Sequence, residues 1–114
     1  MYTINRSIAI IKPKQPFVDW ANQLPDAEWK VSLDNFKVDC LAILIPEYGT
    51  DDEAKEYIAE IYEDIFEEEL FGWCTEESWW PQNLTQEMFW EWFDVELHST
   101  VIDPYMDPIV KEES

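Results

Sequence analysis

The sequence predicts an α/β or α+β fold in which helices pack on a small sheet of about three strands. Two short apolar runs rich in β-branched residues, at 7–11 and 41–45, predict buried strands. Outside these runs, apolar residues recur at the three- and four-residue spacing of helices. A chain of 114 residues is long enough to bury a core as one domain. We expect this acidic domain to span residues 1–103, with residues 104–114 as an extended or loose tail.

The first half of the chain predicts a strand, a helix and a second strand. Pro16 suits the first turn of the helix, because the N–H that proline lacks would be unpaired there. The apolar face that follows consists of Phe17, Trp20, Ala21 and Leu24. One further helical turn is expected near Ser32. A helix between two strands about thirty residues apart favours a parallel strand–helix–strand unit with a right-handed crossover.

The second half begins with a long helix. Thr50 and Glu53 form a capping box that starts it. We expect this helix to run to about Leu70, with Gly72 just past its end. Its apolar stripe consists of Ala54, Tyr57, Ile58, Ile61, Tyr62, Ile65 and Phe66.

Two shorter helical segments and a strand are expected after the long helix. One short helix follows Thr75. Another helix has an apolar face that we expect to pack in the core, formed by Met88, Phe89, Trp92 and Phe93. Residues 94–103 alternate between apolar and polar, which predicts a strand with one covered face.

The acidic residues are concentrated in the second half of the chain. Residues 51–114 carry 20 of the 26 acids and only Lys55 and Lys111 as bases, so they account for most of the net charge of -19. The negative electrostatic potential of such a charge repels nucleic acids and anionic lipid surfaces and attracts basic partners. We therefore expect a basic protein as the partner, without direct binding to nucleic acid or membrane. The oligomeric state stays open.

One arc of the long helix, opposite its apolar stripe, gathers six acids. They are Glu53, Glu56, Glu60, Glu63, Asp64 and Glu67. Helix stability does not explain them, because like charges at this spacing destabilise a helix. A line of carboxylates resembles the charges of a nucleic-acid backbone. One hypothesis is therefore a non-enzymatic protein that binds a nucleic-acid-binding protein as a mimic or inhibitor, and the alternative is a solvated face that maintains solubility.

Five of the seven tryptophans lie between residues 71 and 98. Trp92 belongs to the helical face that we expect in the core, whereas Trp90 falls off that face. With Trp79 and Trp80, it would form an exposed surface that binds lysine or arginine side chains through cation–π contact. The carboxylates beside this surface would be those of Glu76, Glu77, Glu87 and Glu91. The alternative is that these rings make further core contacts.

The alternative function is a small enzyme, either a hydrolase or a metal-dependent enzyme, centred on His98. This is the only histidine, and Glu96 and Thr100 lie on the same face of the last predicted strand. Such neighbours would orient an imidazole for acid–base chemistry, and Asp94 or Asp103 would contribute to a metal site. The spacing matches no established ligand or nucleophile pattern. We therefore expect no catalytic residue, no metal and no cofactor.

Cysteine and glycine usage points away from two other kinds of site. Cys40 and Cys74 occur without a C-x-x-C or Cys/His pattern, so we expect reduced thiols. Gly49 and Gly72 are the only glycines, which leaves no glycine-rich loop to hold a phosphate.

Four segments carry a resemblance to a known family: RSIAIIKPKQPFVDWANQLPD at 6–26, the acidic helix, the Gly-Trp and Trp-Pro segment at 71–81, and MFWEWFDVELHSTV at 88–101. Over nearly the whole chain they resemble a family of small, acidic, uncharacterised bacterial proteins. The resemblance implies a bacterial cytosolic protein and no particular activity. A cytoplasmic location is also expected because the apolar run near the amino terminus is too short for a signal peptide or a membrane span.

Overall fold

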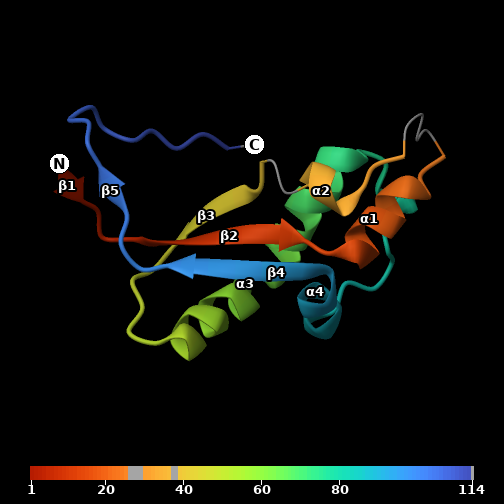
Figure 1. The fold of residues 1–114 in the computed structure, drawn as a ribbon, viewed down its shortest axis with the longest axis horizontal. Helices are drawn as coiled ribbons and strands as arrows, with labels where there is room; N and C mark the ends of the chain where they lie inside the picture. Colours follow the sequence, from red (N-terminus) through yellow and green to blue (C-terminus); the bar gives the residue numbers. More distant parts are fainter. Residues whose placement is uncertain (26–29, 37–38, 114) are drawn as a thin grey trace.

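The computed structural model describes residues 1–25, 30–36 and 39–113 and shows an α+β fold. Helices pack against a central three-stranded sheet, and two very short strands pair beside it (Figure 1). The elements are β1 Tyr2–Thr3, β2 Ser7–Pro13, α1 Gln15–Asn22, α2 Leu33–Phe36, β3 Leu41–Ile45, α3 Asp51–Trp73, the 3-10 helix η1 Glu77–Trp79, α4 Gln86–Trp92, β4 Phe93–His98 and β5 Ile102–Asp103. The prediction of a small sheet with helices packed on it is confirmed.

The strands of the central sheet are all antiparallel, in the order β3-β2-β4. Ser7 of β2 pairs with Ile45 of β3, and Ile11 pairs with Leu41, so the predicted parallel strand–helix–strand unit is wrong. The reason is the length of α1, whose eight residues rise about 12 Å, roughly half the length of β2. This helix does not carry the chain back along the sheet. β3 starts beside the end of β2 and runs in the opposite direction (Figure 1).

The core is rich in aromatic rings. Ile11 of the central strand β2 is completely buried, and so is Phe17 of α1. Phe17 and Phe66 of α3 both pack against Trp92 and Phe93, with ring centroids 5.2 to 6.1 Å apart. The predicted core face of the last helix is therefore confirmed for its aromatic members, and these rings join the helices to the sheet.

Threonine caps start both longer helices of the second half, as the sequence predicts for α3. Thr50 Oγ1 accepts a hydrogen bond from the Glu53 N–H at 3.2 Å, and Thr85 caps α4 in the same way at 3.1 Å. The end of α3 differs from the prediction, because the helix continues to Trp73 and includes Gly72. Neither glycine has a positive φ, so no left-handed turn ends the helix at Gly72.

The two shortest helical segments are also confirmed. The turn expected near Ser32 is α2, and the helix expected after Thr75 is the single 3-10 turn η1. Each segment carries an aromatic side chain. Phe36 of α2 is buried, and Trp79 of η1 is exposed.

The last predicted strand, 94–103, is two strands in the structure. β4 begins one residue earlier, at Phe93, which the prediction placed on a helical face, and it ends at His98. Ser7 Oγ donates a hydrogen bond to Ser99 O at 3.0 Å where the ladder ends. The chain then pairs with the amino terminus, because β5 is antiparallel to β1.

Residues 104–113 contain no helix or strand. Their exposed apolar side chains are Tyr105, Met106, Ile109 and Val110. In the described ranges of the chain, no helix combines the length and the apolar composition that crossing a membrane requires.

Candidate functional site

The six acids predicted to lie on one arc of α3 divide into two groups in the structure. Five of them are exposed, and we call these five the acidic face: Glu56, Glu60, Glu63, Asp64 and Glu67. They lie opposite the buried side of the helix, which contains Ala54, Ile58, Ile65, Phe66 and Leu70. The helical period that buries one side of α3 therefore also presents the acids to solvent.

Glu53 is the exception, because its carboxylate accepts hydrogen bonds from its own helix and from the loop before it. Its Oε1 accepts a hydrogen bond from Tyr57 Oη at 3.1 Å, and its Oε2 accepts one from the Gly49 N–H at 3.4 Å. These bonds hold the first turn of α3 to the preceding loop. Glu53 therefore acts at the start of the helix and is half-buried, in contrast to the acidic face.

The acidic face borders a hollow near the carboxyl end of α3, which we call the acidic hollow. It has a volume of about 310 Å³, and its lining residues are Glu63, Glu67, Glu77, Trp80, Pro81, Gln82, Asn83 and Leu84. Tyr62 Oη donates to Leu84 O at 3.3 Å and so ties the loop to the helix. Partial burial raises the pKa of Glu67, and the charges of Glu63, Asp64 and Glu77 raise it further. The hollow thus concentrates negative charge that a cation would relieve.

The three tryptophans expected on a common exposed surface have different environments. Trp79 is exposed, and its carbonyl accepts a hydrogen bond from Trp20 Nε1 at 3.1 Å. Trp80 packs against the core, donates from Nε1 to Cys74 O at 2.8 Å, and lines the acidic hollow. Of the three, only Trp80 lines that hollow beside the carboxylates.

Trp90 differs most from the expectation, because it also packs against the core. Its ring meets that of Phe89 edge to face, with centroids 5.2 Å apart, and its carbonyl accepts a hydrogen bond from Lys14 Nζ at 2.9 Å. The physical reason is that α4 contacts both α1 and α3, so that neighbours cover more than one of its faces. The alternative of a further core contact is therefore what the structure shows for this residue.

His98 lies at the end of β4 with its side chain about half exposed. Its Nε2 is 3.7 Å from Glu96 Oε1, and Lys12 Nζ is 3.1 Å from Glu96 Oε2. The hydrogen bond and the charge of Lys12 lower the pKa of Glu96. Asp94 instead lies 3.7 Å from Lys14. Across the described part of the chain, no group of three or more His, Cys, Asp or Glu side chains is arranged to hold a metal ion.

Glu69, a half-buried carboxylate that the sequence pattern alone did not single out, lies on the opposite side of α3 from the acidic face. Glu69 follows Ile65 by four residues and Ile58 by eleven, so it falls in the buried stripe of the helix. Its Oε1 is inaccessible to solvent and has no hydrogen-bond partner among the described residues. Burial raises the pKa of Glu69 to about 7. The helical phase of this residue was the signal in the sequence that could have identified it.

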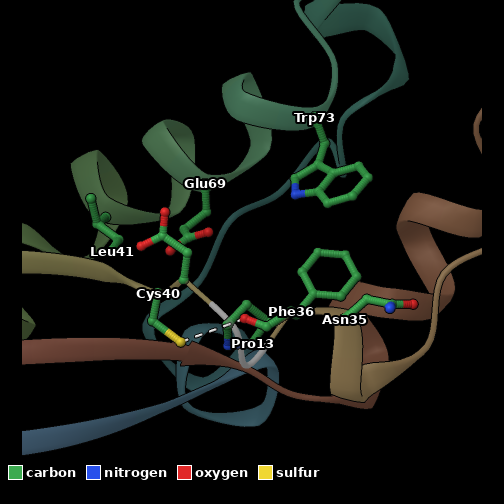
Figure 2. Close-up of a pocket in the computed structure, with 8 residues that line it drawn as sticks. Pro13, Asn35, Phe36, Cys40, Leu41, Glu69 and Trp73 are labelled. Atoms are coloured by element: carbon green, nitrogen blue, oxygen red, sulfur yellow. Dashed lines mark hydrogen bonds between the residues drawn. The ribbon is translucent and has the colours of Figure 1, made fainter.

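Glu69 lines a cavity of about 340 Å³, which we call the Glu69 cavity. Figure 2 shows Glu69 and Trp73 pointing from α3 towards the segment that contains Phe36 and Cys40. The lining residues are Pro13, Asn35, Phe36, Asp39, Cys40, Leu41, Glu69 and Trp73. The cavity therefore combines carboxylates with aromatic rings, and it is separate from the acidic hollow.

Both cysteines are free thiols, as predicted. Cys40 Sγ donates to Phe36 O at 3.5 Å, shown by the dashed line in Figure 2. Burial raises the pKa of the Cys40 thiol, and the charge of Glu69 raises it further. This thiol is therefore held protonated, which makes it a poor nucleophile.

Comparisons of the chain with known protein families, with curated proteins and with solved structures find no match.

Proposed function

We propose that this chain is a non-enzymatic interaction protein whose acidic face binds a basic surface of another protein. The observation that carries the proposal is that the acidic face is exposed and lacks bases. Among the described residues, no ion pair involves a carboxylate of the acidic face, while Lys12 and Lys14 pair with acids of β4. A basic partner would supply the missing counter-charges.

The spacing of the charges supports a partner that ordinarily binds nucleic acid. Glu56 and Glu67 are eleven residues apart, so the five carboxylates of the acidic face extend over about 16 Å of helix. The mean spacing between neighbouring carboxylates is therefore about 4 Å along the axis, comparable with the roughly 3.4 Å per phosphate along one DNA strand. Such a row would occupy the basic groove of a nucleic-acid-binding protein and hold that protein off its ligand.

The acidic hollow gives the surface a shape as well as a charge. Glu63 and Glu67 of the acidic face line it together with Glu77 and the ring of Trp80. A lysine or arginine side chain inserted there would meet carboxylates and an aromatic ring in one place. The acidic face supplies long-range attraction, and the hollow supplies a position for one basic side chain.

The experiment is a capture from a bacterial lysate at low and at high salt, followed by a competition assay on the captured protein. A partner of the acidic face should be released by salt, because screening weakens its charge pairs. Duplex DNA or structured RNA should compete with this chain for that partner. A partner that binds nucleic acid and this chain at the same time would contradict the mimicry, and salt-independent capture would contradict binding through the acidic face.

A further inference from the structure

The Glu69 cavity is bordered by four elements of the fold. Glu69 and Trp73 come from the last turns of α3, and Phe36 comes from α2. Cys40 and Leu41 come from the start of β3 and the residue before it, and Pro13 ends β2. Its volume of about 340 Å³ is at the lower end of the roughly 300–1,000 Å³ typical of small-molecule sites.

Among the described residues, one oxygen of the Glu69 carboxylate lacks the hydrogen bond that a buried polar atom needs. This atom is Oε1, which is inaccessible to solvent. A buried carboxylate is stabilised only where a counter-charge or hydrogen-bond donors replace the water that it has lost. A ligand that carries N–H donors and a positive charge would provide both.

The aromatic wall of the cavity suits the same kind of ligand. The rings of Phe36 and Trp73 lie 4.6 Å apart at their centroids, with an interplanar angle of 35°. Trp73 is 45% exposed, so part of its side chain remains open to an incoming group. Cations bind the face of an indole ring more strongly than that of other aromatic rings. Asp39, which is exposed, adds a second carboxylate to the lining.

We propose that the Glu69 cavity binds a protonated organic cation, with a planar guanidinium as the best fit. A guanidinium forms two parallel hydrogen bonds with a carboxylate and stacks on an aromatic ring, and it sheds water more easily than an ammonium ion. Glu69 would accept its hydrogen bonds, and Trp73 would cover one of its faces. The guanidinium belongs either to a free small molecule or to an arginine side chain of a partner protein.

This site does not rest on the proposed function of the acidic face. Glu69 follows Glu67 by two residues, so the two side chains leave α3 about 160° apart. Glu67 lines the acidic hollow, and Glu69 lines the other cavity. Neutralising the acidic face should therefore leave the affinity of the Glu69 cavity for a guanidinium unchanged.

The direct test is a calorimetric titration of the full chain with ethylguanidinium chloride. Glu69→Gln keeps the size of the side chain and removes its charge, and it should weaken binding at least tenfold. Glu68→Gln is the matched control, because it removes the same charge from an exposed neighbour on the same helix, and it should bind as the parent does. Trp73→Leu removes the indole ring from the aromatic wall, leaves Phe36 and Glu69 in place, and should also weaken binding.

The pH dependence gives a second readout. The cation binds the ionised form of Glu69, whose pKa is about 7 in the free protein, so binding should release protons and be about tenfold tighter at pH 8 than at pH 6. Asp39 and Cys40 are the other titratable groups of the lining, and Lys12 and Glu96 act on the Cys40 thiol from β2 and β4. Glu69→Gln should lose this pH dependence, whereas Trp73→Leu should retain it.

A blocked hexapeptide with one arginine in a neutral sequence distinguishes the two sources of the guanidinium. Tighter binding of the peptide than of ethylguanidinium would assign the site to a protein side chain, and weaker binding would assign it to a free small molecule. Failure of the parent to bind either probe at pH 8 would overturn the proposal. Equal binding by the parent and Glu69→Gln, or equal losses in Glu69→Gln and Glu68→Gln, would also overturn it.

Discussion

Glu69 occupies the position on α3 one turn after Ile65, so a carboxylate takes the core-facing place that an apolar side chain takes in the preceding turn. Ile65 is buried in the core, whereas Glu69 meets the cavity between α3, α2 and the start of β3. The apolar stripe of α3 is therefore interrupted at Glu69, where the helix borders the Glu69 cavity.

The first prediction follows from the raised pKa of Glu69. Its pKa is about 7 in the folded protein and about 4.5 in the unfolded chain, so the folded state holds a proton that the unfolded state releases between these values. The contribution of protonated Glu69 to stability is complete below pH 4.5 and is lost as the pH rises through 7. Relative to Glu69→Gln, the parent should lose on the order of 1–3 kcal/mol of unfolding free energy between pH 4 and pH 8.

Denaturant unfolding of both proteins across this pH range measures the difference. The other carboxylates titrate in both proteins, so most of their contribution cancels in the comparison. Glu68→Gln is again the control, and its difference from the parent should change much less with pH. If the difference in unfolding free energy between the parent and Glu69→Gln did not change with pH, the pKa of Glu69 would not be raised by folding.

The second prediction concerns the aromatic core. Phe17 is completely buried, and its ring packs against those of Trp20, Phe36, Trp92 and Phe93. Phe17→Ala should lower the unfolding free energy by about 3–5 kcal/mol, because it removes apolar contacts and leaves a void. Trp79→Ala should cost well under half as much, since the Trp79 ring is exposed and its carbonyl remains available to Trp20. Similar losses in urea melts would contradict the assigned core.

The third prediction distinguishes the interaction protein from the enzyme centred on His98. His98 is about half exposed and lies 3.7 Å from Glu96, which also pairs with Lys12. His98→Gln should leave the melting temperature and the binding of the captured partner unchanged, since such exposed contacts contribute little. Loss of the biological activity with an unchanged circular dichroism spectrum would instead favour catalysis by His98.

Local signals in the sequence predicted the elements, whereas their arrangement depended on distant contacts. Thr50 marks the start of α3 through a hydrogen bond to a residue three positions away, and the β-branched runs mark β2 and β3. The antiparallel pairing of these strands depends on how far α1 carries the chain. The spacing of the apolar residues in α1 does not determine this distance, because short and long helices have the same spacing.

The candidate site shows the same division. The exposed acids of α3 follow from the helical period, and the position of Glu69 follows from it too. The cavity cannot be predicted from the helical period. It forms because Phe36 contacts Trp73, a ring 37 positions further along the chain. Trp90 was misplaced for a related reason: one helical face was expected to be buried, but α4 packs against neighbours on more than one side.

The last prediction separates a binding role of the acidic face from a solubilising one. Replacing Glu60, Glu63 and Glu67 by Gln removes three charges from a crowded row without shortening a side chain. The isolated variant should melt at least as high as the parent in either case, because repulsion along α3 falls. If the acidic face binds a basic partner, the variant should also associate more slowly, bind more weakly and depend less steeply on salt, because fewer charge pairs form on contact.

The matched control removes three charges from the exposed tail, through Asp107→Asn, Glu112→Gln and Glu113→Gln. Both variants have the same net charge, so a general effect of charge on association would appear equally in both. Weaker binding by the α3 variant alone would place the interaction on the acidic face. A captured partner that binds the α3 variant as tightly as the parent at low salt would end the mimicry hypothesis, because the row of carboxylates would then contribute nothing to the encounter.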